Sequence, residues 1–579
     1  MNDLLIVSNR GPFSFSDDLF NETREKLKNN LQPPRPSFGE GGLVQSMAGL
    51  LRSNRWNTTW IGASMGDRDI DVARGNYRSF FKMLKRHGYA PERFPQIDIY
   101  PDSRMRFRFK DYDFHMRFVF FDTSHMRSYY RKFANGFLWP LMHLTRSPLF
   151  YKKGVVFPRP SFTKNDFVQC TSSSVTFANA IIDEICSSQM PARKNEEIVV
   201  WNQDYHLMQI AEILKALLQE ENLPKEVRKK ISIGHFMHTP FFNIHEIQGL
   251  IRSDKRKRVK DQIYDPFAEN IETVLKKLTW GMLSNDFVGF HTKEYCDNYL
   301  EALEEWFPVE IKIAGGFYEI IYQDHITTIG PFPIGLDVEK ILSEVSGNKP
   351  LKYRLGRESL LKKMNKDKEQ GMYVFGGLER CDYTKGLIER LGIFQHTLNN
   401  LKNLKKDARL YQVTSPSRLG NPDYQKLKKI IDYEISSLNR KLRRKRIIHL
   451  DEGISVPQNY RFMKEVDVML VTPLEDGMNL VALEYILSQK YREIPRRGVL
   501  VLSQSGAARV LKEKRFGEDD GIVYVNPLRP KDAGDKLFQA LKKGRHISER
   551  VIEYVEAEHR VDKWADMNIN AILNCKKSA

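Results

Sequence analysis

The stretch VFGGLERCDYTKGL (Val374–Leu387) runs a short apolar segment into two glycines and then sets two cations, Arg380 and Lys385, on either side of an acid and a tyrosine. The cations are five positions apart, and a regular helix would turn them roughly 140° from each other. They can converge on one ligand only where part of the stretch is a loop. The alternative is a solvated turn between a strand and a helix, with no ligand.

Seven other stretches show the same pattern of a short apolar run followed by Gly, Asn, Asp or another polar residue, with helix-length segments between them. They are LLIVSNRG, EEIVVWNQD, KISIGHFMH and NDFVGFHT in the first half, and ARLYQVTSPSR, DVMLVTPLEDG and GVLVLSQSG in the second. Continuous Val, Ile and Leu runs are typical of parallel strands that helices cover on both faces. Two such series predict an α/β fold with two Rossmann-like, doubly wound parallel sheets.

The two series are separated by GPFPIGLDVEKILSEVSGNKP (Gly330–Pro350), which contains Gly335 and a polar end. We place the division there, with one domain over residues 1–345 and a second over residues 346–579 that ends in a closing helix. The polar segment Ser14–Phe38 is expected to be a long loop of unassigned purpose. Ligands of such sheets bind at the carboxyl ends of the strands, so the polar residues that follow each strand are the candidates for function.

The composition is that of a globular protein. The 579 residues are 41% hydrophobic and 28% charged, which argues against large-scale disorder, and the length predicts two or three domains. No apolar run approaches the roughly 20 residues that span a bilayer, and the first residues lack a secretory pattern. The five cysteines are scattered and never form a CxxC pair, so we expect no disulfide framework, no metal site and a cytoplasmic location.

The chain carries a net charge of +18, which favours anionic partners such as phosphorylated metabolites, nucleic acid or anionic lipid. The densest basic run, SDKRKRVK (Ser253–Lys260), has no aromatic residues between its cations and lies in no recognisable nucleic-acid-binding motif. A solvated helix face is the better interpretation. A nucleic-acid-binding protein remains a rival hypothesis that rests on the charge alone, and a salt-dependent shift on DNA or RNA would support it.

Ten strings, in order along nearly the whole chain, are similar to the trehalose-6-phosphate synthase family. They are SNRGP, GEGGLV, YYRKFANGFLWPLMH, WNQDYHLMQI, IGHFMHTPF, DFVGFHTKEY, FPIGLD, GGLERCDYTKG, EDGMNLVALEY and GVLVLSQSGAA. The resemblance implies a retaining glycosyltransferase of the GT-B type, with two Rossmann-like domains facing across a cleft. It further implies transfer of glucose from UDP-glucose to glucose 6-phosphate, giving trehalose 6-phosphate and UDP.

By this resemblance, Arg380 and Lys385 grip the diphosphate of the donor. The physics agrees, because cleavage of a sugar–nucleotide bond builds negative charge on the leaving phosphate, and fixed cations stabilise it most in the transition state. A helix that starts after Gly386 would add its positive end. The resemblance implies a donor set of Gly41, Gly42, Arg380, Lys385, Asp476, Gly477, Met478, Asn479, Leu480 and Glu484.

Within the donor set, Gly41 and Gly42 would let the backbone approach the phosphate, with a plain turn as the alternative. Asp476 to Asn479 would contact the glucosyl hydroxyls, and Glu484 the ribose hydroxyls. The simpler interpretation of Asp476 and Asn479 is a helix N-cap, and a capped helix start is also what presents amides to a ligand.

The resemblance assigns an acceptor set as well. Arg suits a phosphate because its planar fork binds it bidentately, and aromatic side chains can bound the sugar face. The acceptor set implied is Arg10, Tyr130, Trp139, Asp204 and Arg418, with core packing as the alternative for the two aromatic residues. His238 would lie beside the transferred sugar, and the implied catalytic residues are Arg380, Lys385, His238 and Asp204.

The family is thought to work by front-face attack, in which the leaving phosphate takes the proton of the acceptor hydroxyl. Positioning and charge stabilisation then do most of the work, and no cofactor or metal is expected. UDP-glucose is a substrate. A glycosidase would need two flanking carboxyl groups, and the candidates Asp204 and Asp476 fall in different expected domains.

The chain departs from the usual family pattern at five positions. They are Ala63 where a second tryptophan is usual, Gln203 for His, Cys381 for Leu, Glu475 for Arg and Leu483 for Lys. Ala63 leaves open a related transferase with another acceptor, such as glycerol 3-phosphate, and Glu475 with Leu483 leaves open the base of the nucleotide. A catalytically weak sensor of sugar phosphate is a further alternative, against which the retained Arg380 and Lys385 argue.

The chain has no room for the phosphatase to which such synthases are sometimes fused, so we expect a separate trehalose-phosphate phosphatase in the pathway. A homo-oligomer is left open. We expect neither a nucleic-acid nor a membrane partner.

Overall fold

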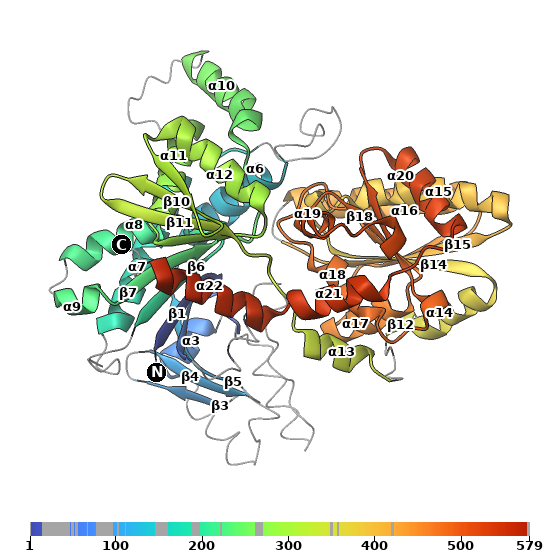
Figure 1. Cartoon of the computed structure of the whole chain (residues 1–579), viewed down its shortest axis with the longest axis horizontal. Coiled ribbons are helices and arrows are strands. Elements are labelled where there is room, and N and C mark those ends of the chain that lie inside the picture. The colour runs from blue at the N-terminus through green and yellow to red at the C-terminus, as the bar shows by residue number, and fades with distance from the viewer. Residues whose placement is uncertain are drawn as a thin grey trace. The chain divides into compact units, whose positions relative to one another are not determined.

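The computed structural model describes residues 2–13, 15, 47, 51, 56–66, 68–76, 96–100, 103–109, 112–144, 160–186, 197–220, 223–260, 270–347, 351, 353–355, 358–418 and 422–575. The chain divides into two compact units (Figure 1). Unit 1 comprises Met1–Trp139, Pro160–Phe332 and Ala565–Ala579, and unit 2 comprises Pro140–Arg159 and Pro333–Trp564. The expected loop Ser14–Phe38 and the glycines Gly41 and Gly42 lie outside the described residues.

The chain passes from unit 1 to unit 2 at Phe332–Pro333, earlier than the division at residues 345 and 346 that the sequence pattern suggests. The reason is helix α13 (Val338–Val345), whose apolar side chains are buried in unit 2. The end of the chain also differs from the expectation. Helix α22 (Val561–Cys575) ends in unit 1, where a Cβ atom on Gly234 would lie 2.4 Å from Ile572.

Unit 1 is built on one 11-stranded sheet with the order β3-β4-β5-β2-β1-β6-β7-β8-β11-β10-β9. The strands are β1 (Asp3–Arg10), β2 (Asn57–Ala63), β3 (Gln96–Ile99), β4 (Met105–Phe109), β5 (Tyr112–Val119), β6 (Ile198–Gln203), β7 (Ile231–Phe236), β8 (Phe287–Phe290), β9 (Glu310–Ala314), β10 (Phe317–Tyr322) and β11 (His325–Pro331). From β5 to β11 the neighbours are parallel, and antiparallel strands extend both edges.

The four apolar runs expected as strands in the first half are β1, β6, β7 and β8, and the prediction of a parallel sheet is confirmed. The strands β3, β4 and β5 were not expected. Strand β5 shows why, because buried and half-buried residues alternate along YDFHMRFV, so it lacks the continuous apolar run of a strand covered on both faces.

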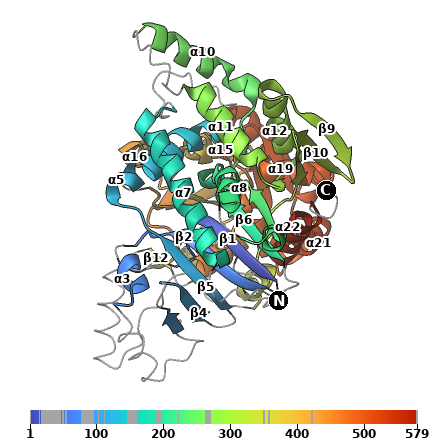
Figure 2. The ribbon, with the colours of Figure 1, turned by 90° about the vertical axis from the view of Figure 1, so that its left-hand side faces the viewer.

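The core of unit 1 lies between the sheet and two helices, α7 (Lys164–Cys186) and α8 (Ile210–Glu220), which cross one face of it in Figure 2. Leu5 and Val200 of the sheet pack there with Phe177 and Leu214 of the helices, all fully buried. The other helices of unit 1 are α3 (Asp69–Ala73), α5 (Thr123–Met126), the π-helix η1 (Arg127–Leu138), the 3-10 helix η3 (Tyr205–Leu207), α9 (Lys225–Arg228), α10 (Ile244–Lys260), α11 (Ile271–Leu283) and α12 (Lys293–Trp306). Helix α6 (Trp139–Leu144) begins at the last residue of the first segment of unit 1.

Unit 2 is built on a six-stranded, fully parallel sheet with the order β16-β15-β14-β17-β18-β19. Its strands are β14 (Met372–Arg380), β15 (Asp407–Ser415), β16 (Ile447–Leu450), β17 (Val468–Val471), β18 (Val499–Ser503) and β19 (Ile522–Val525), beside a short hairpin of β12 (Arg354–Leu355) and β13 (Glu358–Ser359). The four apolar runs expected in the second half are β14, β15, β17 and β18. The prediction of two Rossmann-like α/β domains is therefore confirmed.

Helices connect the strands of unit 2, as a parallel sheet requires. They are α14 (Leu360–Glu369), η4 (Tyr383–Lys385), α15 (Leu387–Leu401), η5 (Lys402–Leu404), α16 (Pro422–Lys441), α17 (Val456–Glu465), α18 (Leu480–Ser488), η6 (Ile494–Arg496), α19 (Gly506–Glu513), η7 (Glu518–Asp520), α20 (Pro530–Lys542) and α21 (Glu549–Glu558). The polar residues of unit 2 that are considered below follow the carboxyl ends of the strands of its sheet.

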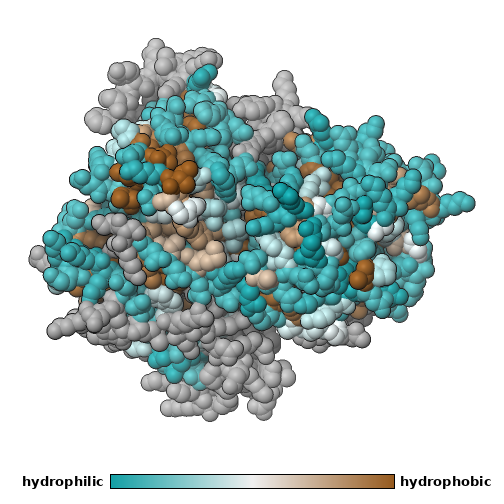
Figure 3. All heavy atoms as spheres, viewed as in Figure 1, coloured by the Kyte–Doolittle hydropathy of each residue, from teal (hydrophilic) through white to brown (hydrophobic). Residues whose placement is uncertain are grey.

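The described surface is largely hydrophilic in the view of Figure 3, and hydrophobic side chains gather over the part of unit 1 where Figure 1 draws β10 and β11. Ile313, at the edge strand β9, is 77% exposed, and Ile326 on β11 is 39% exposed. None of the helices in the described residues combines the length and apolar character that crossing a bilayer requires.

Candidate active site

The turn after β14 carries the two cations that open the sequence analysis. Arg380 is the last residue of β14 and is exposed, whereas Lys385 is buried at the end of η4. Gly386 then adopts φ +59°, in the left-handed region, and a Cβ atom there would lie 2.0 Å from the carbonyl oxygen of Thr472. Only glycine fits this position, because both the backbone angle and the close approach exclude a side chain. The expected loop between the cations, and the helix that starts after Gly386, are confirmed.

Lys385 forms a buried ion pair with Asp476, which lies between β17 and α18. Burial lowers the pKa of Lys385, but the carboxylates of Asp476 and Glu379 outweigh it, and the pKa lies above its ordinary value. Burial raises the pKa of Asp476, and Lys385 reverses this, so that pKa lies below its usual range. Both groups are therefore charged at neutral pH, and the lysine is held in one place before any ligand arrives.

Asn479 links this ion pair to a second one. Its Nδ2 donates to Asp476 at 3.1 Å and to Glu379 at 3.3 Å, while its Oδ1 is buried with no hydrogen-bond partner. Glu379 also accepts from the fully buried Arg390 at 3.4 Å. Burial raises the pKa of Glu379, which Lys385 and Arg390 oppose. The unpaired amide oxygen of Asn479 is an acceptor that a ligand hydroxyl could satisfy.

The turn Asp476–Leu480 is packed tightly against the start of α19. A Cβ atom on Gly506 would lie 1.8 Å from the carbonyl oxygen of Gly477, and the Gly506 amide donates to the Asp476 carbonyl at 3.1 Å. Met478 is buried, and Asn479 is the N-cap residue of α18, which begins at Leu480. The Asn479 side chain makes no capping hydrogen bond. The capping interpretation is therefore wrong for the Asn479 side chain, because it accepts no hydrogen bond from the first amides of α18.

Glu484 lies one turn into α18 and is partly buried. Burial raises the pKa of Glu484 to about 7, although Lys340 and a hydrogen bond from Tyr460 oppose the shift. A carboxyl group with this pKa changes its charge readily when hydroxyl donors approach it.

Arg418 lies in unit 2, where it donates to the fully buried Asp382 at 3.0 Å and contacts the hydroxyl of Tyr424. Burial raises the pKa of Asp382, but Arg418, Arg380 and the Thr384 amide reverse this, and the pKa lies below its usual value. Arg418 adopts φ +47°, which is uncommon for a residue with a side chain. Its guanidinium is thus fixed beside the turn that carries Arg380 and Lys385.

In unit 1, Arg10 and Tyr130 are brought together. Arg10 ends β1 and is exposed, and its Nη2 donates to the Tyr130 hydroxyl at 2.8 Å. Tyr130 lies in the π-helix η1, a rare element that often occurs at functional sites. Asn135 fastens this helix, because its Nδ2 donates to the Tyr130 carbonyl at 2.7 Å and its Oδ1 accepts from Tyr205 at 3.1 Å.

Aromatic rings continue from Tyr130 toward Trp139. Tyr130 stacks on His206 with ring centroids 5.7 Å apart, His206 lies 3.9 Å from Tyr205, and Tyr205 lies 5.9 Å from Trp139. Trp139 is 8% exposed, so core packing accounts for most of its surface. Tyr130 is only half-buried and keeps surface for a ligand.

Asp204 follows β6 with a strained backbone, at φ 73° and ψ 171°. This region is essentially restricted to glycine and costs about 1–3 kcal/mol, and such strain gathers at functional sites. The Asp204 amide donates to the Phe236 carbonyl at 2.8 Å, and its Oδ1 accepts from the His238 amide at 3.2 Å. The His238 ring in turn lies 2.8 Å from Gln203, measured from Nε2 to Oε1. Asp204 and His238 are thus neighbours, as their placement after adjacent strands predicts.

Comparison with known proteins identifies the family of this chain. The model of glycosyltransferase family 20 matches residues 2–250 and 268–574. The chain belongs to glycosyltransferase family 20. The resemblance to the trehalose-6-phosphate synthase family and the prediction of a glycosyltransferase are confirmed.

Among its relatives is the 56 kDa subunit of alpha,alpha-trehalose-phosphate synthase [UDP-forming] of Saccharomyces cerevisiae. The two are 27% identical over 93% of this chain and 87% of the relative. The synthase of Candida albicans is 25% identical over 91% of this chain and 97% of its own length. A crystal structure of the UDP-forming synthase of Burkholderia xenovorans in complex with glucose-6-phosphate superposes with a TM-score of 0.67, at 21% identity, over 98% of this chain and 99% of that one.

Four of the five departures from the family pattern have a structural account. Glu475, one of the departures named in the sequence analysis, accepts from Arg509 of α19 at 2.8 and 3.3 Å, so its charge is balanced locally. Ala63 is 1% exposed and packs in the core of unit 1 with Val119 and Phe177. Leu483 is fully buried and Cys381 is 5% exposed, so both are core residues here.

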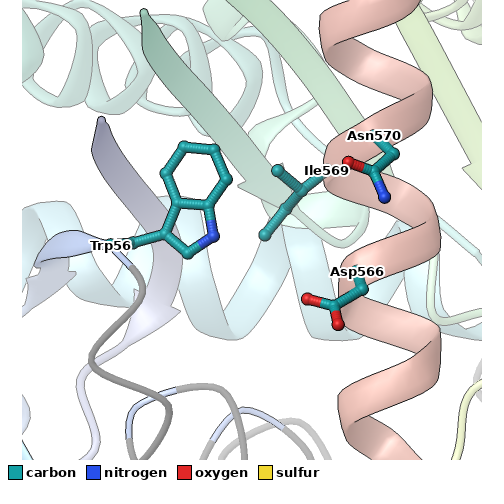
Figure 4. Close-up of a pocket in the computed structure, with 4 residues that line it drawn as sticks. All are labelled: Trp56, Asp566, Ile569 and Asn570. Atoms are coloured by element: carbon teal, nitrogen blue, oxygen red, sulfur yellow. The ribbon is translucent and has the colours of Figure 1, made fainter. Parts of the chain in front are cut away.

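A pocket lies away from these residues in the described part of unit 1. It has a volume of about 270 Å³ and is lined by Trp56, Asp566, Ile569 and Asn570 (Figure 4). Trp56 directly precedes β2, so this pocket lies at the amino end of that strand, whereas Arg10 and Asp204 follow the carboxyl ends of theirs. Within the described ranges, no group of three or more His, Cys, Asp or Glu side chains is arranged to hold a metal ion.

Sequence reasoning missed several residues that hold the site together. They are Glu379 and Arg390 in unit 2, and Asn135, Tyr205 and His206 in unit 1. One signal was present for Glu379, because a carboxylate at the end of a buried strand needs a partner. No sequence pattern pointed to Asn135, because its role depends on a π-helix that the sequence does not predict.

Proposed function

We propose that this glycosyltransferase moves glucose from UDP-glucose to glucose 6-phosphate with retention of configuration, giving trehalose 6-phosphate and UDP. One observation carries the proposal: a chain of family 20 retains both a cation set in unit 2 and an arginine–aromatic set in unit 1. The relatives that support this assignment are UDP-forming trehalose-phosphate synthases.

In the proposed reaction, Arg380 and Lys385 stabilise the leaving diphosphate. Lys385 is held by Asp476 before the reaction, so no reorientation is needed as charge develops, and preorganised charges of this kind supply much of a barrier reduction. Removal of one such group typically costs about 3–4 kcal/mol of transition-state stabilisation. The amides that begin α15 and α18 add partial positive charge, with Gly41 and Gly42 as further proposed backbone contacts.

The proposed sugar contacts are Asp476, Gly477, Met478, Asn479 and Leu480, with Glu484 on the ribose hydroxyls. The unpaired Oδ1 of Asn479 supports a hydroxyl donor in this region. We propose that His238 lies beside the transferred sugar. The leaving phosphate itself takes the proton of the acceptor hydroxyl, so no carboxylate nucleophile and no cofactor are part of the proposal.

The proposed acceptor contacts are Arg10, Tyr130, Trp139, Asp204 and Arg418. Arg10, whose Nη2 lies 2.8 Å from the Tyr130 hydroxyl, is the proposed ligand of the phosphate of glucose 6-phosphate. Arg418, which Asp382 holds, is a further proposed acceptor contact. Asp204 would accept a hydrogen bond from an acceptor hydroxyl. The proposal places the enzyme in the cytoplasm and upstream of a separate phosphatase that removes the product phosphate.

One panel of assays tests the function. Purified protein is supplied with UDP-, GDP- or ADP-glucose, each with glucose 6-phosphate or glycerol 3-phosphate, and release of the nucleoside diphosphate is followed. We expect the combination of UDP-glucose and glucose 6-phosphate to dominate, with an α,α-linked product by NMR. A preference for glycerol 3-phosphate would replace the proposed acceptor, and absence of turnover with every pair would favour the sensor hypothesis.

A further inference from the structure

The side chain of Gln203 is fixed in one orientation at the end of β6. It is fully buried, its Nε2 lies 3.4 Å from the Trp201 carbonyl oxygen, and its Oε1 lies 2.8 Å from His238 Nε2. A backbone carbonyl can only accept, so the amide nitrogen must face Trp201. The amide oxygen, which also only accepts, must therefore face the histidine.

The His238 ring is neutral. Burial lowers the pKa of His238 well below its ordinary value, and the neighbouring imidazoles of His291 and His235 lower it further. A neutral imidazole carries one N–H, and the nitrogen that faces an obligate acceptor must be the one that carries it. His238 Nε2 is therefore protonated, and Nδ1 is a hydrogen-bond acceptor.

We propose that Gln203 is a positioning residue that holds His238 as the Nε2–H tautomer and so makes its Nδ1 the acceptor for a hydroxyl of the transferred sugar. The inference deepens the proposed function and rests on it for the identity of the ligand. It concerns a position where the family usually has histidine. An imidazole there could donate or accept and would leave the tautomer of His238 undetermined, whereas this glutamine commits it.

The orientation of the His238 ring is fixed by more than one contact. The backbone amide of His238 donates to Asp204 at 3.2 Å, so the last residue of β6 and the residue after it both hold His238. The rings of Phe236 and His291 lie 4.8 and 5.6 Å from the His238 ring, measured between centroids. A ring enclosed in this way cannot exchange its two nitrogens by flipping without displacing its neighbours.

The tautomer is read directly by NMR of the full-length protein labelled with ¹⁵N-histidine, with H238Q used to assign the His238 signals. We expect Nε2 of His238 to show the shift of a protonated nitrogen and Nδ1 that of an unprotonated one, independent of any activity. The reverse pattern, or an averaged one, overturns the proposal whether or not the protein transfers glucose.

The functional half uses Gln203→Met, which keeps the volume and removes the acceptor. We expect loss of the fixed tautomer and a drop in kcat of about 10-fold or more, because a hydrogen bond that orients His238 is removed, with KM for glucose 6-phosphate nearly unchanged. Gln209→Met is the matched control. It removes a buried glutamine of the same unit that bonds Thr171, and we expect it to leave the tautomer and kcat unchanged.

Gln203→Glu provides a second variant should the methionine variant fold poorly. A carboxylate beside His238 raises the pKa of the imidazole, with His291, His235 and Asp204 as the other titratable groups nearby. We expect kcat to fall as pH drops through the range where the imidazole becomes charged, while the wild-type profile shows no such step. Full kcat in both Gln203 variants with a correctly measured tautomer would overturn the positioning role, while the wild-type product assay still decides the proposed function.

Discussion

At the residue scale, the candidate site is made of charges that already have partners. Lys385 is paired with Asp476, Arg390 with Glu379, and Arg418 with Asp382. A charge buried with its partner is fixed in position, and removal of one partner leaves the other uncompensated. The functional and the structural costs of a substitution are therefore mixed for the buried Lys385. They are mixed to a smaller degree for Arg380, which is exposed but whose charge also lowers the pKa of Asp382.

The first prediction concerns this difference. Arg380→Ala should lower kcat by about 100-fold or more and should lower the urea midpoint less than Lys385→Ala does. Lys385→Ala should also lose about 3–5 kcal/mol of stability, because Asp476 stays buried and charged. The double variant K385M/D476N should recover most of that stability and none of the activity. Equal stability of Lys385→Ala and the wild type would contradict the buried ion pair.

The strained backbone of Asp204 gives the second prediction. Glycine tolerates φ 73° and ψ 171° and alanine does not, so Asp204→Gly should be more stable than Asp204→Ala by about 1–2 kcal/mol in urea unfolding. Asp183, exposed on helix α7, is the matched control, where glycine should be less stable than alanine by about 1 kcal/mol. Both Asp204 variants should lose activity. The same order at both positions would rule out the strain.

The third prediction follows from the pKa of Glu484, which burial raises to about 7. Ribose hydroxyls donate to the ionised form and favour it, so binding of UDP-glucose should lower this pKa and release up to about half a proton at pH 7. Calorimetry in buffers of different ionisation enthalpy measures the release. UDP-glucose is suited to this because its diphosphate, esterified at both ends, does not titrate there. Glu484→Gln should abolish the release, and proton uptake by the wild type would contradict the assignment.

The same pKa has a consequence for stability. The carboxyl of Glu484 binds its proton more tightly in the folded state, so the free energy of unfolding should fall as pH rises from about 4.5 to about 7. Glu484→Gln should remove this contribution.

At the scale of elements, the sheets place polar residues at the carboxyl ends of neighbouring strands, and irregular elements then aim them. The π-helix η1 carries Tyr130, and the left-handed Gly386 lets α15 start directly behind the turn of Arg380 and Lys385. Short apolar runs predict the strands because burial on both faces demands them. Nothing local predicts η1, since Asn135 and Tyr205 stabilise it through contacts made only in the folded chain.

The fourth prediction tests that element. Asn135→Ala removes the hydrogen bonds to the Tyr130 carbonyl and from Tyr205, and should lower stability by about 1–3 kcal/mol. It should also raise KM for glucose 6-phosphate by about tenfold, because Tyr130 is no longer held beside Arg10. Asn439→Ala is the matched control, since Asn439 makes the same kind of paired bonds to Ile447 in unit 2. An unchanged KM in Asn135→Ala would exclude the role of η1.

At the scale of the whole molecule, the proposed donor and acceptor groups come from different parts of the chain. The donor residues described by the structure belong to unit 2, while Arg10, Tyr130, Trp139, Asp204 and His238 belong to unit 1. Two residues are exceptions. Arg418 is an acceptor candidate that belongs to unit 2, and His238, proposed to lie beside the transferred sugar of the donor, belongs to unit 1. A substitution in one set should therefore leave the binding of the other substrate nearly intact.

The fifth prediction uses this separation. Arg380→Ala should weaken binding of UDP-glucose, and Arg10→Ala should weaken binding of glucose 6-phosphate, each by about 1.5–3 kcal/mol as expected for hydrogen bonds to charged groups. Titration calorimetry with each ligand alone measures both. Each variant should bind the other ligand as the wild type does. Loss of donor affinity in Arg10→Ala would show that the two sets are not separate.

The sequence by itself determined the two series of buried strands, the parallel sheets and the family, because burial on both faces and ten ordered motifs leave local marks. It also placed the candidate residues after strand ends. Only the tertiary structure decided that Lys385 is paired with Asp476 and that Asn135 holds the π-helix η1. It also decided that the backbone of Asp204 is strained and that α22 ends in unit 1. These facts depend on which distant residues meet, and no periodicity along the chain records that.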